Sequence, residues 1–164
     1  MAGPSGSAVF FGLGTSVCVS DDATFLVRSE PANYSIGNCH TIRFRENTKR
    51  FFPELFHLPS SQRANGSQRI EAFTRQLPIQ TSSDCCVEQV VFLNRNHVGE
   101  PQLREFDKGW ALEWFTSFTS YGEATVRQDQ LRAYESLLSV PVWELCYNDL
   151  DDAVLLLQSL KCSG

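Results

Sequence analysis

Residues 87–93 have the sequence Val-Glu-Gln-Val-Val-Phe-Leu, and this stretch decides the fold class of the chain. Its second half is an unbroken apolar run, which is typical of a strand buried on both faces of a sheet. Outward from it, short or alternating apolar runs predict further strands at residues 8–13, 16–20, 23–28, 41–45 and 142–146. A stretch rich in Ser, Gln, Asn and Gly predicts a surface loop at residues 59–67.

Three helices are predicted, at residues 107–119, 123–138 and 149–160. In the first helix, Trp110, Trp114 and Phe118 recur every four residues and share one side, which we interpret as a face packed in the core. The last helix is expected to begin after a cap at Asn148. Because strands come first and helices last, we predict one α/β domain over residues 1–164. Its mixed β-sheet would be covered by mostly C-terminal helices.

The composition argues against several classes of partner. The chain has 164 residues, a net charge of -5 and a pI near 5.2, without a Lys/Arg cluster. Nucleic acids and anionic lipids require positive charge to neutralise phosphates, so neither is expected to bind. The apolar runs are far shorter than the roughly 20 residues that a membrane-spanning helix needs. Six cysteines without CxxC spacing, and a start without a secretory leader, favour free thiols and a cytoplasmic location.

Two short motifs are candidates for chemistry. The first is Gly-Pro-Ser-Gly-Ser at residues 3–7, which partly matches a phosphate-binding loop, GxxxxGK[ST]. In such a loop glycines let backbone N–H groups surround the phosphates, Lys neutralises them, and the hydroxyl binds Mg²⁺. The second is Asp21-Asp22 after an apolar strand, since paired carboxylates can bind a metal or accept a proton. A flexible Gly/Ser start and solvated turn carboxylates are the simpler explanations of these motifs.

Together with the order of the predicted elements, these motifs resemble HPr kinase/phosphorylase and the bacterial HPr-kinase-like proteins. That family shares a fold core with ATP-dependent phosphoenolpyruvate carboxykinase. The matching segments are SDDATFLVR at 20–28, IRFR at 42–45, RFFPEL at 50–55, VVFL at 90–93, VPVWEL at 140–145 and NDLDDAV at 148–154. The resemblance spans most of the chain, but only the first thirty or so residues carry catalytic motifs. It implies a P-loop kinase-like core and ATP-dependent serine kinase activity.

The resemblance also implies a role for each motif residue. ATP with Mg²⁺ would be the cofactor, and its phosphates would lie on Gly3, Ser5, Gly6 and Ser7. Asp21 and Asp22 would bind the metal, and this pair would also provide the catalytic base for the attacking hydroxyl. A protein would be the substrate or partner.

The sequence departs from the family pattern where catalysis depends on it. Val9 and Phe10 stand where the phosphate loop carries its Lys and its metal-binding hydroxyl. Only twelve residues separate Ala8 from Asp21, too few for the loop's helix and the next strand. We therefore expect a kinase-like core without its first strand and P-loop helix, from a truncated chain that binds ATP weakly or not at all.

Three functions stay open on this basis. The first is a degenerate HPr-kinase-like serine kinase domain, and the second is a non-catalytic domain that binds a protein through its sheet and C-terminal helices. The third is a small globular domain with a role unrelated to this family. A second register, Phe-Phe-Gly-Leu-Gly at residues 10–14, resembles the segment before the carboxykinase loop but also lacks the Lys. Cys39, His40, His57 and His97 have no metal-ligand spacing and are interpreted as scattered residues.

Overall fold

The structure is a computed structural model that describes residues 8–11, 18–20, 24–27, 33–95, 99–119 and 122–161. The chain forms two compact units, each with its own hydrophobic core. The first, named here the helical unit, comprises Met1–Thr15, Val27–Tyr34 and Cys86–Gly164. The second, the β unit, comprises Ser16–Leu26 and Ser35–Cys85.

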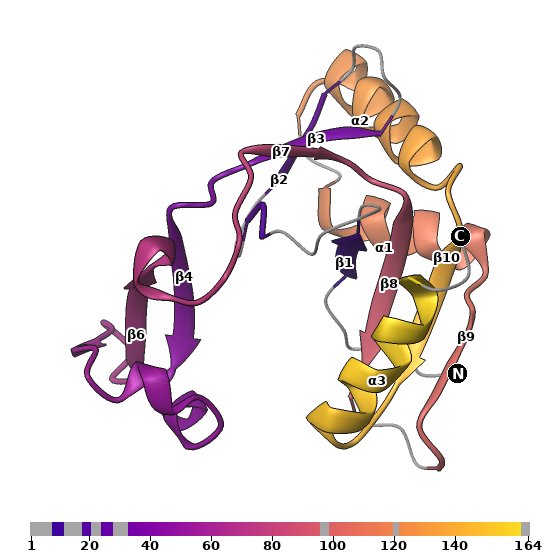
Figure 1. Cartoon of the computed structure of the whole chain (residues 1–164). Helices are drawn as coiled ribbons and strands as arrows, with labels where there is room; N and C mark the ends of the chain where they lie inside the picture. The colour runs from indigo at the N-terminus through magenta and orange to yellow at the C-terminus, as the bar shows by residue number, and fades with distance from the viewer. Residues whose placement is uncertain are drawn as a thin grey trace. The chain divides into compact units, whose positions relative to one another are not determined.

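A four-stranded sheet with the order β1-β8-β10-β9 forms the centre of the helical unit (Figure 1). Its strands are β1 (Ala8–Phe11), β8 (Gln89–Asn94), β9 (Gln102–Glu105) and β10 (Val142–Cys146). β8 and β10 are parallel, with Val142 opposite Val90 and Cys146 opposite Asn94, whereas β1 and β9 are antiparallel to their neighbours. Parallel neighbours require a long crossover connection, and this one contains β9 and two helices.

Three helices belong to this unit: α1 (Lys108–Thr119), α2 (Ala124–Leu137) and α3 (Leu150–Lys161). On one face of the sheet, the fully buried ring of Phe92 contacts Trp114 of α1, with ring centroids 5.3 Å apart. On the other face, Val91 and Leu145 share a core cluster with Ala153 of α3. Because successive strand residues point to opposite faces, the apolar run of β8 supplies both cores.

Two three-stranded sheets build the β unit, with the orders β2-β3-β7 and β4-β6-β5. The strands are β2 (Thr24–Leu26), β3 (Tyr34–Gly37), β4 (Thr41–Arg45), β5 (Ser60–Gln62), β6 (Gln68–Phe73) and β7 (Asp84–Cys86). Short 3-10 turns lie at Glu46–Arg50, Pro53–Leu55 and Thr74–Gln76. One face of the second sheet covers a core of Leu55, Leu58, Ile70 and Ala72. The unit therefore has a sheet with one buried and one exposed face.

The hairpin between β5 and β6 replaces part of the predicted loop at residues 59–67. Gly66 has a φ of 79°, a left-handed conformation that favours glycine. The Asn65 side chain accepts hydrogen bonds from the backbone N–H and the hydroxyl of Ser67. An Asn-Gly turn of this kind pairs its flanking strands. The sequence concealed β5 because its Ser and Gln residues have low strand propensity, and only pairing with β6 makes it a strand.

The prediction of mixed α/β structure is confirmed, and β4 and β10 have the predicted bounds. α1 begins one residue later than predicted and ends at the predicted residue. The prediction of one mixed sheet is wrong, because β4 lies in a different sheet from β8 and β10. β4 alternates polar and apolar residues, which suits a sheet with one wet face. β8 and β10 have buried residues on both faces and need cover on both.

Three further details correct the sequence predictions. Within the described part of residues 16–20, the β-type pairing is a single bridge from Cys18 to Thr81. Strands β3, β7 and β9 have only three or four residues each, so their sequences carry little strand signal. The cap of α3 is Asp149 rather than Asn148, because the Asp149 carboxylate accepts a hydrogen bond of 2.8 Å from the Asp151 N–H.

Candidate functional site

The residues assigned by the resemblance to ATP, Mg²⁺ and catalysis lie outside the described residues: Gly3, Ser5, Gly6, Ser7, Asp21 and Asp22. The two positions that a phosphate loop would fill with its Lys and its hydroxyl are described. Val9 and Phe10 lie in β1, opposite Val91 and Val90 of β8. In a phosphate loop this segment begins a helix whose N-terminus binds the anion, and an antiparallel strand does not fit that role.

A polar cluster lies at the carboxyl ends of the parallel strands β8 and β10. Its centre is Glu144 of β10, whose residue surface is 4% exposed. Asn94 Nδ2 donates a hydrogen bond of 2.9 Å to Glu144 Oε1, and Arg104 Nε donates one of 2.7 Å to Oε2. The Arg104 Nη2 atom lies 2.6 Å from the same oxygen. Three neighbouring strands thus meet at one carboxylate.

The strand registers explain why these side chains meet. Glu144 is directly opposite Arg104 of β9, and Cys146 is opposite Asn94 of β8. Alternation along β10 then places Glu144 and Cys146 on the same face as Phe92. α1 covers the Phe92 part of this face, and the polar cluster follows toward the carboxyl ends of the strands. Open α/β sheets place their ligands at that edge, which makes this cluster a candidate for chemistry.

The electrostatics of the cluster favour a structural role. The hydrogen bond to Glu144 raises the pKa of the Arg104 guanidinium. Burial, and next the charge of Glu144, raise the pKa of the Cys146 thiol, which keeps it protonated at neutral pH. Both oxygens of Glu144 already accept hydrogen bonds from donors on neighbouring strands. We interpret the cluster as an ion pair that holds β9 against β10, and not as a nucleophile with its base.

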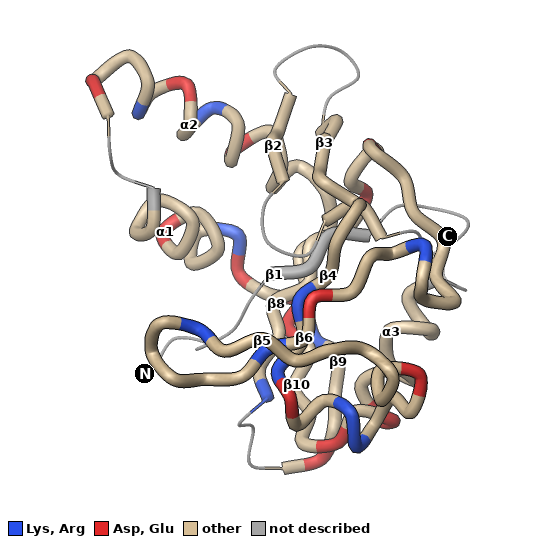
Figure 2. The backbone as a smooth tube through the Cα atoms, turned by 90° about the vertical axis from the view of Figure 1, so that its left-hand side faces the viewer, with Lys and Arg blue, Asp and Glu red and all other residues tan. Residues whose placement is uncertain are grey.

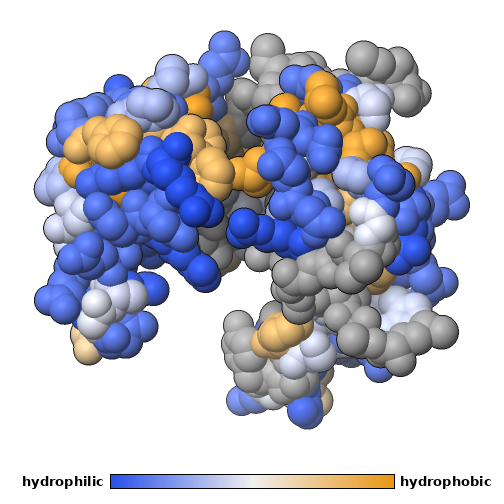
Figure 3. All heavy atoms as spheres, turned by 90° about the horizontal axis from the view of Figure 1, so that it is seen from below, coloured by the Kyte–Doolittle hydropathy of each residue, from blue (hydrophilic) through white to orange (hydrophobic). Residues whose placement is uncertain are grey.

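The α1 stripe, which we define as Trp110, Trp114 and Phe118, is a surface of a different kind. Trp114 packs edge-on against the buried ring of Phe92, and its centroid lies 4.9 Å from that of Phe118. Trp110 is nevertheless 55% exposed and Phe118 is 67% exposed. The prediction of a fully packed face is therefore correct only for Trp114. Figure 3 shows that large hydrophobic side chains, in orange, reach the molecular surface among hydrophilic ones.

Local contacts hold the α1 stripe in place. The Asp107 carboxylate caps α1 by accepting a hydrogen bond of 2.9 Å from the backbone N–H of Trp110. Phe115 of the same helix stacks on Tyr134 of α2, with ring centroids 5.2 Å apart. The helix is thus held by a cap at its first turn, by packing on the sheet and by stacking on α2. Its exposed aromatic rings are presented from a rigid support.

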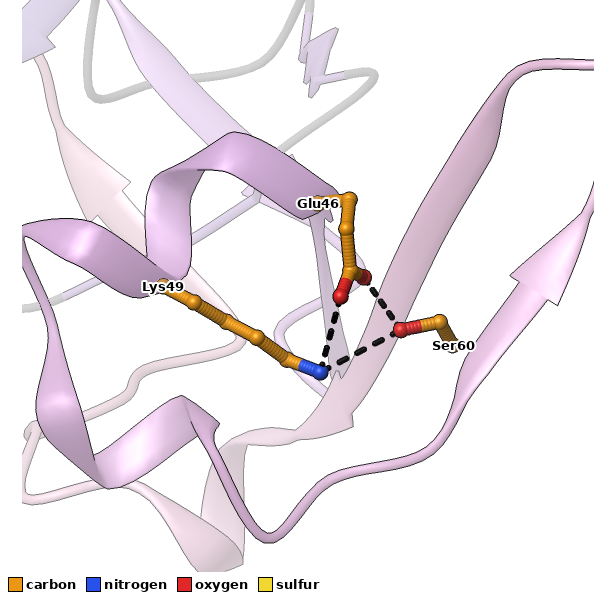
Figure 4. A network of polar contacts seen from close by, with 3 residues as sticks. All are labelled: Glu46, Lys49 and Ser60. Carbon is orange, nitrogen blue, oxygen red and sulfur yellow. Dashed lines mark hydrogen bonds and ion pairs between the residues drawn. The ribbon is translucent and has the colours of Figure 1, made fainter.

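A second polar arrangement, in the β unit, joins Glu46, Lys49 and Ser60 (Figure 4). The Ser60 hydroxyl donates a hydrogen bond to Glu46, and Lys49 Nζ lies 3.3 Å from Ser60 Oγ and 3.0 Å from Glu46 Oε1. The hydrogen bond from Ser60, followed by that from Lys49, lowers the pKa of Glu46. A serine nucleophile needs a base, and the lowered pKa makes the Glu46 carboxylate a weaker one. The network instead connects a 3-10 turn to β5.

In the part of the chain that the structure describes, no three His, Cys, Asp or Glu residues are grouped so that they could hold a metal ion. The described segments also contain no helix of the length and apolar character needed to cross a membrane. Comparisons of the chain with protein-family models, with curated proteins and with solved structures find no match.

Sequence reasoning missed the Glu144 cluster, although one signal was available. Glu144 is the single charged residue in the strand sequence Val-Trp-Glu-Leu-Cys, and a charge inside a buried strand requires a partner. The identity of that partner was not available, since Arg104 is forty residues away in sequence. The exposure of Trp110 and Phe118 was missed because helical periodicity defines a face without showing what covers it.

Proposed function

We propose that this chain is a non-catalytic protein-interaction domain and that the α1 stripe is its binding surface. The observation that carries the proposal is the exposure of Trp110 and Phe118 on a helix anchored through Trp114. Exposed aromatic side chains on a rigid support are typical of the residues that dominate binding energy at protein interfaces. Because the support is preordered, binding a partner costs less conformational entropy.

The charge around the α1 stripe indicates the chemistry of the partner. The helical unit contains thirteen Asp and Glu residues against seven Lys and Arg. Asp107 and Glu113, both exposed, lie on or next to α1, where the exposed Lys108 is the one basic residue. An acidic surface with exposed aromatic rings complements a segment that is apolar on one side and basic on the other. We therefore assign a basic amphipathic helix of another protein as the partner.

The first expected result concerns binding by the α1 stripe. The probe is a synthetic amphipathic helical peptide of Leu and Lys. Its binding is measured by the change in tryptophan fluorescence of the full chain. The variant Trp110→Ala/Phe118→Ala should bind this peptide about 30-fold more weakly than the wild type, the loss typical of an interface hot spot. Leu155→Ala is the matched control, since Leu155 is 64% exposed on α3.

Two outcomes would contradict this proposal. One is equal binding by the wild type and the double variant. The other is an equal loss of binding in the Leu155→Ala control, which would indicate general hydrophobic adhesion. A Leu and Glu peptide of the same length tests the charge assignment, and it should bind more weakly than the Leu and Lys peptide.

The second expected result concerns the rival kinase function. Val9 and Phe10 replace the Lys and the hydroxyl that bind phosphate and Mg²⁺ in the resembling family. Losing the contact between a Lys and a phosphate weakens binding by about 4 kcal/mol, for unit charges about 4 Å apart at an effective dielectric of 20. Titration calorimetry with ATP and Mg²⁺ should therefore show weak binding or none. Micromolar or tighter binding that Asp22→Ala abolishes would restore the kinase-like function.

A further inference from the structure

The exposed face of the β4–β6 sheet carries a concentration of arginine. We define the arginine face by its four basic side chains and by the two residues between them: Arg43, Arg45, Arg69, Arg75, Glu71 and Phe73. Strand alternation and register place Arg43 opposite Glu71 and Arg45 opposite Arg69, on the side away from the core residues Ile70 and Ala72. Figure 2 shows the Lys and Arg positions of these strands in blue.

The charges of the arginine face do not balance. Among the described residues that make up this face Glu71 is the single acid, and it contacts two of the arginines, Arg43 at 3.8 Å and Arg69 at 3.5 Å. Arg45 is exposed and directly opposite Arg69, so two like charges form a cross-strand pair. Like charges in that position destabilise a sheet. A cross-strand pair of arginines that destabilises the sheet is expected where the positive charge serves to bind a negatively charged partner.

The last strand residue adds an aromatic element to the arginine face. Phe73 is 50% exposed, and the guanidinium carbon of Arg75 lies 5.2 Å from the centroid of its ring. A guanidinium on an aromatic ring keeps its planar donors oriented. All four cations of this face are arginines, which bind carboxylates in pairs of parallel hydrogen bonds, whereas Lys acts as a point charge.

We infer that the arginine face binds an extended acidic segment of a partner protein, with carboxylates at every second residue. In an extended segment, alternate side chains point to one side and match the two-residue spacing of Arg43 and Arg45 on β4. A single-stranded nucleic acid fits less well, because such sites use several aromatic rings in series and this face has one. The inference is independent of the α1 stripe, whose partner has the opposite charge.

The test uses the full chain and a fluorescein-labelled peptide of alternating Glu and Ala, with a Gln and Ala peptide as the uncharged control. Fluorescence anisotropy should show that the wild type binds the Glu peptide, and that added salt weakens this binding. Arg45→Glu should weaken binding by about tenfold or more, because it reverses one charge of the face. Arg50→Glu is the matched control: it makes the same change of net charge on a 3-10 turn outside the face.

A second measurement separates lost binding from lost folding. Arg45→Glu creates an opposite-charge pair with Arg69, so hydrogen exchange of the β6 amides should be unchanged or slower. The inference would be overturned if the wild type bound neither the Glu peptide nor an oligonucleotide. An equal loss of affinity for the Glu peptide in the Arg50→Glu variant would also overturn it. Faster exchange in Arg45→Glu would also overturn it. Tighter binding of a labelled oligothymidine than of the Glu peptide would reassign the face to nucleic acid.

Discussion

Replacement of Phe92 by alanine is expected to lower the free energy of unfolding of the helical unit by about 4 kcal/mol, within the range typical of large-to-small core changes. The Phe92 side chain is fully buried. Its ring centroid lies 4.7 Å from that of Phe106, 5.3 Å from that of Trp114 and 5.8 Å from that of Phe115. Removing this ring leaves a cavity among three aromatic partners, and tightly packed surroundings fill such a cavity only partly.

Urea unfolding followed by tryptophan fluorescence measures this effect, because all three tryptophans lie in the helical unit. Phe118→Ala is the matched control, since it removes the same atoms from an exposed position on α1. Its effect should stay below about 1 kcal/mol, as expected for a surface substitution with limited contacts. A loss of less than about 2 kcal/mol for Phe92→Ala would contradict the packing described here.

The second large effect concerns the ion pair between Arg104 and Glu144. Arg104→Met should lower the free energy of unfolding by about 2–3 kcal/mol, because it removes charged hydrogen bonds from a buried carboxylate. Glu144→Met should also destabilise, since it leaves Asn94 and Arg104 without their acceptor. The double variant Arg104→Met/Glu144→Met should be more stable than the sum of the single losses predicts. The Glu144 side chain is buried and the Arg104 side chain is 53% exposed, and replacing an ion pair that has a buried member by apolar residues is often close to neutral.

A double-mutant cycle by urea unfolding gives the coupling between the two residues. The control is Arg132→Met, which removes an exposed ion pair with Asp129. In this pair Arg132 Nη1 lies 3.7 Å from Asp129 Oδ1. That change should cost less than about 1 kcal/mol, the upper range for surface ion pairs. Additive losses for Arg104→Met and Glu144→Met would show that the two side chains do not interact in solution.

Much of the local structure could be predicted from the sequence. The alternation of residues 41–45 and the apolar strand at 142–146 have the bounds that their patterns indicated. The helix at 107–119 was predicted from aromatic spacing, and α1 follows it closely. The residues assigned to phosphate and metal binding remain predictions, since Gly3, Ser5, Gly6, Ser7, Asp21 and Asp22 lie outside the described residues.

The sequence by itself determined the strands with an alternating or apolar pattern, the three helices and which faces are apolar, because backbone preference and side-chain periodicity are local properties. Only the tertiary structure decided how the strands pair. It separated β4 from β8, placed Arg104 opposite Glu144, and set Arg45 opposite Arg69. It also decided that Trp110 and Phe118 stay exposed while Trp114 is packed. Register and burial arise from competition between segments far apart in sequence, and no local pattern contains that information.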